Sequence, residues 1–142
     1  MRNRNPETFK VPEVVDDQID KATLLRHGVF DAPEKGFLQI SEKAPGSSRP
    51  GICWSADIVR QEAVMFKGTS QQPKRAKYLA SYAIIEPSDQ NGLALRTYFN
   101  VSEFVLVSTR KLELLNHNRR LGTLSQEDVA TVTQALDELR RV

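Results

Sequence analysis

Apolar residues recur at two different spacings along the chain, which divide it into a helical start, a strand-rich middle and a helical end. In "EVVDDQIDKATLLRHG", from Glu13 to Gly28, they return every three to four positions, as on one helix face: Val15, Ile19, Ala22 and Leu25. Glycine commonly ends a helix, so the sequence predicts a helix that stops at Gly28. The polar residues 1–12 are expected to form a loose leader before it.

Short apolar runs separated by glycine, proline, serine and asparagine fill the middle of the chain. They are "GFLQISEK" (36–43), "PGICWSADIV" (50–59), "EAVMFKG" (62–68), "KYLASYAIIEP" (77–87) and "LALRTYFNVSEFVLVS" (93–108), the last with room for one or two strands. Runs of this length are typical of strands in small antiparallel folds. We therefore expect an α+β fold, mostly β, built on a small and strongly bent antiparallel sheet or barrel.

The end of the chain, "TLSQEDVATVTQALDELRRV", predicts a second helix. Ser125 and Asp128 have the spacing of a capping box, in which each side chain bonds the other residue's backbone N–H. The apolar residues that follow form one stripe: Val129, Val132, Leu136 and Leu139. Acidic residues in the first turn and arginines in the last match the helix dipole. We expect this helix to pack on the sheet.

Composition narrows the class of protein. With 142 residues the chain is long enough for one ordinary domain, and its net charge of +2 is too small to predict nucleic-acid binding by itself. Its one cysteine, Cys53, lies in an apolar run and is expected to be a buried, inert thiol. The sequence has no apolar run of the roughly 20 residues that span a membrane and no signal-peptide pattern. A soluble, cytoplasmic protein is expected.

Most familiar catalytic patterns are absent from the sequence. It has no glycine-rich phosphate loop, no Gly-x-Ser-x-Gly elbow and no histidine pair for a metal, since His27 and His117 fall far apart in a predicted helix and a predicted loop. We therefore expect neither a metal nor a cofactor.

Polar residues gather instead at the ends of two predicted strands. Arg49 precedes the second strand, Thr69 ends the third, and further polar and basic residues follow it: Ser70, Gln71, Lys74, Arg75 and Lys77. In a small bent sheet the ends of neighbouring strands can meet. A guanidinium, a hydroxyl and nearby lysines suit a phosphodiester, because they neutralise and hydrogen-bond its oxygens.

Each of these residues also has a structural interpretation. Arg49 can be a solvated charge at a strand end, and Thr69 with Ser70 can simply form a turn. The run from Lys74 to Lys77 can be an ordinary solvated face. Trp54 is expected in the core, and His117 on the surface of a loop.

From Gly36 to Val142 the chain resembles the MazF/PemK toxins of bacterial toxin–antitoxin pairs. The resemblance runs in order through "KGFLQIS", "RPGICWS", "VMFKGTSQ", "NVSEFVLVSTRKL" and "RRLGTLSQEDVATVTQALDELRRV". It implies an SH3-like barrel with a C-terminal helix, usually a homodimer. Residues 34–142 would form this barrel domain, and residues 1–33 would be an N-terminal extension with its own helix.

The resemblance also implies a function. Members commonly cleave single-stranded RNA, such as mRNA, without a metal, through attack of the 2′-hydroxyl on the neighbouring phosphorus, and a cognate antitoxin protein neutralises them. Arg49 matches the family's catalytic arginine and Thr69 its catalytic threonine. The residues around them would bind RNA: Ser48, Ser70, Gln71, Lys74, Arg75 and Lys77.

One segment departs from the family pattern. Many relatives carry an acidic residue followed by glutamine where this chain has Ser102 and Glu103, and an arginine follows where it has Val105. Glu103 is the candidate third catalytic residue if it faces the site, but a shift by one residue in a strand turns a side chain to the opposite face. The alternative is a non-catalytic relative that binds RNA, or binds a protein as a gyrase poison does.

Overall fold

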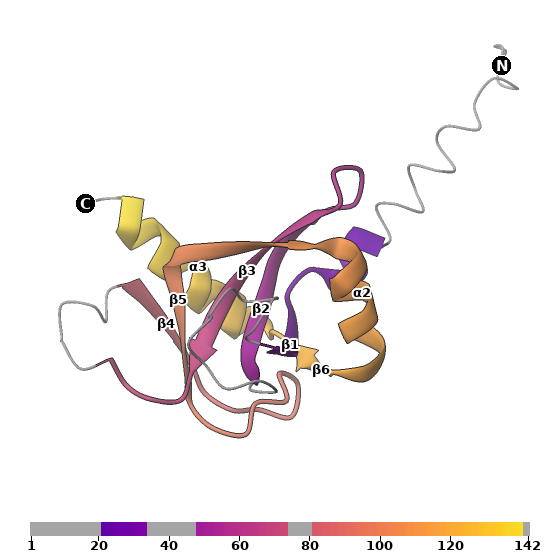
Figure 1. Ribbon diagram of the computed structural model, residues 1–142. Helices are drawn as coiled ribbons and strands as arrows, with labels where there is room; N and C mark the ends of the chain where they lie inside the picture. Colours follow the sequence, from indigo (N-terminus) through magenta and orange to yellow (C-terminus); the bar gives the residue numbers. More distant parts are fainter. Residues whose placement is uncertain (1–20, 34–47, 74–80, 141–142) are drawn as a thin grey trace, which may run out of the picture.

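A computed structural model describes residues 21–33, 48–73 and 81–140, which form a curled antiparallel sheet with helices packed on it (Figure 1). Residues 21–25 are helical. The elements that follow are β1 (Gly28–Pro33), β2 (Ser48–Asp57), β3 (Glu62–Thr69), β4 (Tyr82–Ile85), β5 (Thr97–Ser108), α2 (Thr109–Asn118), β6 (Arg120–Thr123) and α3 (Gln126–Arg140). The six strands lie in the order β4-β5-β3-β2-β1-β6, and every neighbouring pair is antiparallel. The expected α+β, mostly β fold is confirmed.

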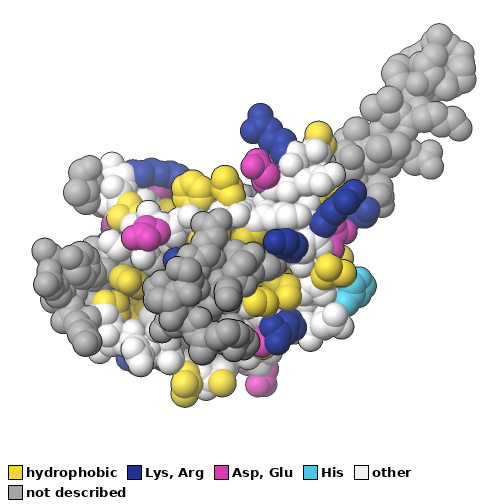
Figure 2. All heavy atoms as spheres, viewed as in Figure 1, with side chains coloured by type: hydrophobic (Ala, Val, Ile, Leu, Met, Phe, Trp, Pro, Cys, Tyr) yellow, Lys and Arg dark blue, Asp and Glu magenta, His cyan; other side chains and the backbone are white. Residues whose placement is uncertain are grey.

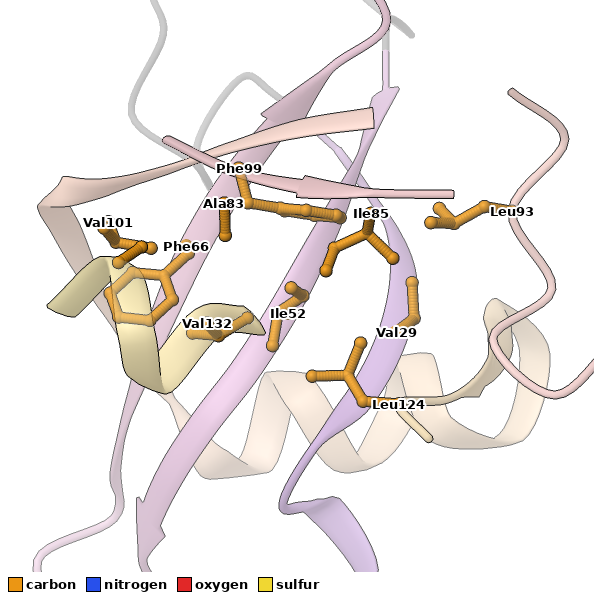
Figure 3. Close-up of a cluster of buried hydrophobic side chains, with 11 residues drawn as sticks. Val29, Ile52, Phe66, Ala83, Ile85, Leu93, Phe99, Val101, Leu124 and Val132 are labelled. Atoms are coloured by element: carbon orange, nitrogen blue, oxygen red, sulfur yellow. The ribbon is translucent and has the colours of Figure 1, made fainter. Parts of the chain in front are cut away.

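The sheet has a hydrophobic cluster on each face, because successive side chains of a strand point to opposite sides. On the α3 face, Val132 of the helix lies between Ile52 and Phe66 of the sheet, in a cluster that also holds Val29 and Phe99 (Figure 3). On the α2 face, Leu112 of α2 packs in a second cluster with Leu25, Phe30, Ala32, Cys53, Met65, Val105 and Val107. A strand residue that belongs to one of these clusters therefore lies on the corresponding face of the sheet.

The C-terminal helix forms as its sequence predicts. The Ser125 hydroxyl accepts the N–H of Asp128 at 3.0 Å, and the Asp128 carboxylate accepts the N–H of Ser125 at 3.1 Å. This reciprocal pair is the predicted capping box. Val132 is fully buried, and the other apolar residues of the stripe pack partly buried against the same cluster: Val129, Leu136 and Leu139.

Three parts of the fold differ from expectation. The N-terminal helix ends at Leu25, and Gly28 does not stop it but begins β1, so residues 28–33, expected in the N-terminal extension, belong to the sheet. The expected loop around His117 is the helix α2, which begins where the Ser108 hydroxyl accepts the N–H of Arg110 at 3.2 Å. The short strand β6 then pairs with β1. The strand expected at 36–43 lies outside the described residues.

Residues 97–108 form one strand, β5, interrupted by a large bulge. Phe66 pairs with Phe104 and Gly68 with Phe99, so β3 advances by two residues where β5 advances by five. The Asn100 side chain holds the extra residues in place, because its Oδ1 accepts the Ser102 N–H at 3.0 Å and the Ser102 hydroxyl at 2.6 Å. Bulges bend the strand that contains them, and β5 turns a sharp corner in Figure 1.

Candidate active site

Arg49 lies near the start of β2, on the α2 face of the sheet. It is opposite Ala32 of β1, and the next pair along on the same face sets Gly51 against Phe30. Ala32 and Phe30 both belong to the α2-face cluster. Directly opposed residues of an antiparallel pair point to the same side, so Arg49 projects from this face, where it is partly exposed.

Thr69, the last residue of β3, lies at the same end of the sheet as Arg49. The β2–β3 register sets Cys53 against Met65 and ends with Gly51 against Lys67. Arg49 and Thr69 each lie two residues beyond that last pair, so both share its face. The two residues that the sequence singled out as catalytic therefore project from one face at one end of the sheet. Their catalytic roles stay a prediction.

The Thr69 hydroxyl has a structural partner and can still act as a donor. Its oxygen accepts the backbone N–H of Gln71 at 3.2 Å, which shapes the turn after β3. A hydroxyl also carries one hydrogen to donate, and that hydrogen is not used in this bond. Thr69 can therefore be a turn residue and a ligand for a phosphoryl oxygen at once.

The expected RNA-binding residues lie around this pair where the structure describes them. Ser48 is exposed at the start of β2, and Ser70 and Gln71 are exposed directly after β3. Lys74, Arg75 and Lys77 fall outside the described residues. On the side seen in Figure 2, basic and acidic side chains are mixed with exposed apolar ones.

Glu103 lies on β5, the strand that pairs with β3. Val105 pairs with Met65 and Phe104 with Phe66, and the β3–β5 register then shifts, so Glu103 lies in the bulge of β5, next to the last regular pair. It is exposed there. Because alternation of side chains is interrupted in a bulge, both orientations that the sequence left open for Glu103 stay open, and its catalytic role stays a prediction.

Sequence reasoning missed Lys67. It precedes Thr69 by two residues in β3 and is opposite Gly51, so it projects from the α2 face, as Arg49 and Thr69 do. The signal was the two-residue period of "FKGT", which puts Lys67 and Thr69 on one side of a strand.

Other reactive side chains of the described chain do not form a second site. Cys53 is fully buried, and burial raises the pKa of its thiol to about 12, so the expected inert thiol is confirmed. No three histidine, cysteine, aspartate or glutamate side chains gather to hold a metal within residues 21–33, 48–73 and 81–140. No helix in those ranges is long and apolar enough to cross a membrane.

The fold has counterparts among solved structures. One is described as an endoribonuclease from a mycobacterial species, with a TM-score of 0.53 and 16% identity over 82% of this chain and 90% of that chain. Another is the Mycobacterium tuberculosis toxin MazF-mt6, with a TM-score of 0.53 and 14% identity over 80% of this chain and 96% of that chain. No protein-family model and no curated protein sequence matches the chain. At these identities the likeness is one of fold: the chain has the fold of the MazF toxins.

Proposed function

We propose that the protein is a MazF-like toxin, an endoribonuclease that cleaves single-stranded RNA without a metal. The observation that supports the proposal is that Arg49 of β2 and Thr69 of β3 project from one face at the same end of the sheet, each two residues beyond the Gly51–Lys67 pair. The fold that holds these residues is shared with a mycobacterial endoribonuclease and a MazF toxin. Glu103, in the bulge of the neighbouring strand β5, is the proposed third catalytic residue.

The proposed reaction uses the RNA's own 2′-hydroxyl as the nucleophile. Its oxygen bonds to the neighbouring phosphorus while the bond from phosphorus to the 5′-oxygen of the next nucleotide breaks. Glu103 accepts the 2′-hydroxyl proton, and the leaving 5′-oxygen takes a proton from the Arg49 guanidinium or from water. Arg49 and the Thr69 hydroxyl stabilise the charge that grows on the phosphoryl oxygens.

Two protein partners belong to the proposal: a second copy of the chain and a cognate antitoxin. Phe104 and Leu106 of β5 are 58% and 49% exposed. Apolar side chains this exposed on a strand are typical of surfaces that a partner covers. This supports association with a protein without distinguishing the two partners.

A cleavage assay tests the proposal. Single-stranded RNA is incubated with the protein and a chelator, and the product ends are sequenced. We expect cuts at a short recurring sequence and 2′,3′-cyclic phosphate ends, with a DNA strand of the same sequence left intact because it lacks the 2′-hydroxyl.

Substitutions of Arg49 and Thr69 test whether these two residues are responsible for RNA cleavage. Arg49→Ala should lower the cleavage rate about a hundredfold or more, as loss of a group that stabilises transition-state charge does. Thr69→Ala should also lower it, and Thr69→Ser should restore it. The matched control is Arg60→Ala, whose exposed side chain lies at the turn between β2 and β3, at the far end of both strands. Equal activity of Arg49→Ala and Arg60→Ala would refute the assignment.

One observation favours a second candidate function, binding without cleavage. Val105, where many relatives have an arginine, is only 6% exposed and packs in the α2-face cluster. It cannot supply a cation to the site. If the folded protein leaves all RNA intact, a binding role toward RNA or a protein such as gyrase is the better account.

A further inference from the structure

We propose that Lys67 binds a phosphate of the RNA backbone adjacent to the one held by Arg49 and Thr69. The inference rests on the proposed function, since it assigns a second position of the same RNA strand. It makes Lys67 a binding residue that holds the substrate in register, separate from the three residues that act on the scissile phosphate.

The position of Lys67 fits a neighbouring phosphate. It lies two residues before Thr69 on β3, and residues two apart on a strand are about 6.6 Å from each other on the same face. This is comparable to one step along an extended nucleic-acid backbone. Lys67 is opposite Gly51, which is two residues from Arg49 on β2. An RNA strand that crosses Arg49 and Thr69 along the direction of β3 would therefore pass over the Lys67 ammonium.

The described surroundings of Lys67 give its charge no partner. Among residues 21–33, 48–73 and 81–140, no hydrogen bond or ion pair involves its ammonium. Its neighbour Gly51 offers no side chain, and a Cβ there would lie 2.9 Å from the Met65 methyl carbon. Lys67 is partly buried as a residue. Its ammonium can therefore give its hydrogen bonds to an anionic ligand, as a charge-assisted contact.

A common structural reason for a strand lysine does not apply. Lysines often occupy edge strands, where their charge prevents another chain from pairing with the edge. β3 lies inside the sheet and is paired on both sides, with β2 and with β5. The charge of Lys67 therefore does not protect an edge.

Salt dependence of RNA binding tests the inference directly. Each phosphate contact on a single strand contributes about 0.7 to the slope of log affinity against log salt. The probe is a fluorescent single-stranded RNA of mixed sequence, 2′-O-methylated throughout so that it cannot be cleaved. Binding of wild type, Lys67→Gln, Lys67→Arg and the control Arg60→Gln is followed by anisotropy over a series of salt concentrations.

We expect Lys67→Gln to bind more weakly and to lower the slope by about 0.7, with Lys67→Arg and Arg60→Gln close to wild type. If Lys67→Gln keeps the wild-type slope, Lys67 does not contact a phosphate and this inference fails while the proposed function stands. If Lys67→Gln keeps the slope but shifts the pH profile of cleavage, Lys67 acts on Glu103, which also overturns it. If the wild type binds no RNA at low salt, the proposed function fails as well. The thermal midpoint of each variant checks its fold, and Lys67→Met provides a second charge-free variant with a similar stem.

Discussion

The side chain of Asn91 holds the loop between β4 and β5 against the rest of the fold through hydrogen bonds, and substitutions at this position test how much these bonds stabilise the protein. It is fully buried and uses all four hydrogen-bonding positions of its amide. Oδ1 accepts the N–H groups of Ser88 and Leu93, both at 3.0 Å. Nδ2 donates to the Glu86 carbonyl at 2.9 Å and to the Asp128 carboxylate, at the start of α3, at 3.1 Å.

The cost of Asn91→Ala can be worked from these four bonds. A neutral hydrogen bond contributes about 1 kcal/mol net to stability, and one to a charged group about 2 kcal/mol. Some of the partners lie in partly exposed loop backbone, where water can replace the amide. We therefore expect Asn91→Ala to lower the free energy of unfolding by about 3–4 kcal/mol. For a chain of this length that corresponds to a fall of about 10–15 °C in Tm.

Asn91→Asp separates hydrogen bonding from shape. The aspartate fills the same volume and keeps an acceptor, but it loses both donated bonds and puts a second carboxylate against Asp128. Burial and this like charge raise the pKa of a carboxyl group. The variant should therefore recover stability, relative to Asn91→Ala, as the pH falls and the new carboxyl takes up a proton.

Urea unfolding followed by the fluorescence of Trp54, the only tryptophan, measures these changes. Asn118→Ala, at an exposed position at the end of α2, is the control and should change stability by less than about 0.5 kcal/mol. A loss of under about 1 kcal/mol in Asn91→Ala would refute the reasoning, because it would mean that water replaces the amide at no cost.

Three further predictions concern side chains that are buried or partly buried. Arg120 donates hydrogen bonds to the Leu24 carbonyl at 2.6 Å and to the Asn116 side chain at 2.7 Å, so Arg120→Ala should lower the free energy of unfolding by about 3 kcal/mol, measured by urea unfolding. Burial, and then the charge of Arg26, lower the pKa of His27 from its ordinary value of 6.5, and the buried His27 Nε2 has no hydrogen-bond partner among the residues that the structure describes. Because the neutral form is the one favoured in the folded state, the stability tied to His27 is present above about pH 6.5 and is lost as the pH falls through the lowered pKa. His27→Asn, which suits the left-handed backbone at this position (φ 64°), should remove that part of the pH dependence of the urea midpoint. Since the pKa of Cys53 is raised to about 12, a thiol reagent at neutral pH should modify the protein only after denaturation, and rapid reaction of the folded protein would contradict its burial.

The elements that the sequence predicted well are those whose signal is local. The capping box of α3 and the apolar runs of β2 and β3 depend on residues that are close in the sequence. β1 and β6 were missed because they are short and stabilise each other across some ninety residues, with Gly28 paired to Thr123. α2 was missed because it buries only Thr109 and Leu112, which is too little for an apolar stripe.

In the candidate site, too, some features have a local signal in the sequence and others depend on long-range pairing. Arg49 and Thr69 could be proposed because strand ends are visible in the sequence. The face that each side chain occupies depends on register, which long-range pairing decides. This is why the sequence leaves the orientation of Glu103 open, and why Lys67 becomes a candidate only through its pairing with Gly51.

The bulge in β5 changes which residues of the strand face each side of the sheet. Before it, the odd-numbered Phe99 and Val101 pack under α3; after it, the odd-numbered Val105 and Val107 pack under α2. Three extra residues, an odd number, have moved the odd-numbered side chains of the strand from the α3 face to the α2 face. The length of this segment is therefore constrained: deleting one residue would return the downstream strand to its first frame, turning Val105 and Val107 away from the α2-face cluster and Phe104 and Leu106 toward it. In this fold, insertions and deletions between Asn100 and Glu103 should therefore be poorly tolerated.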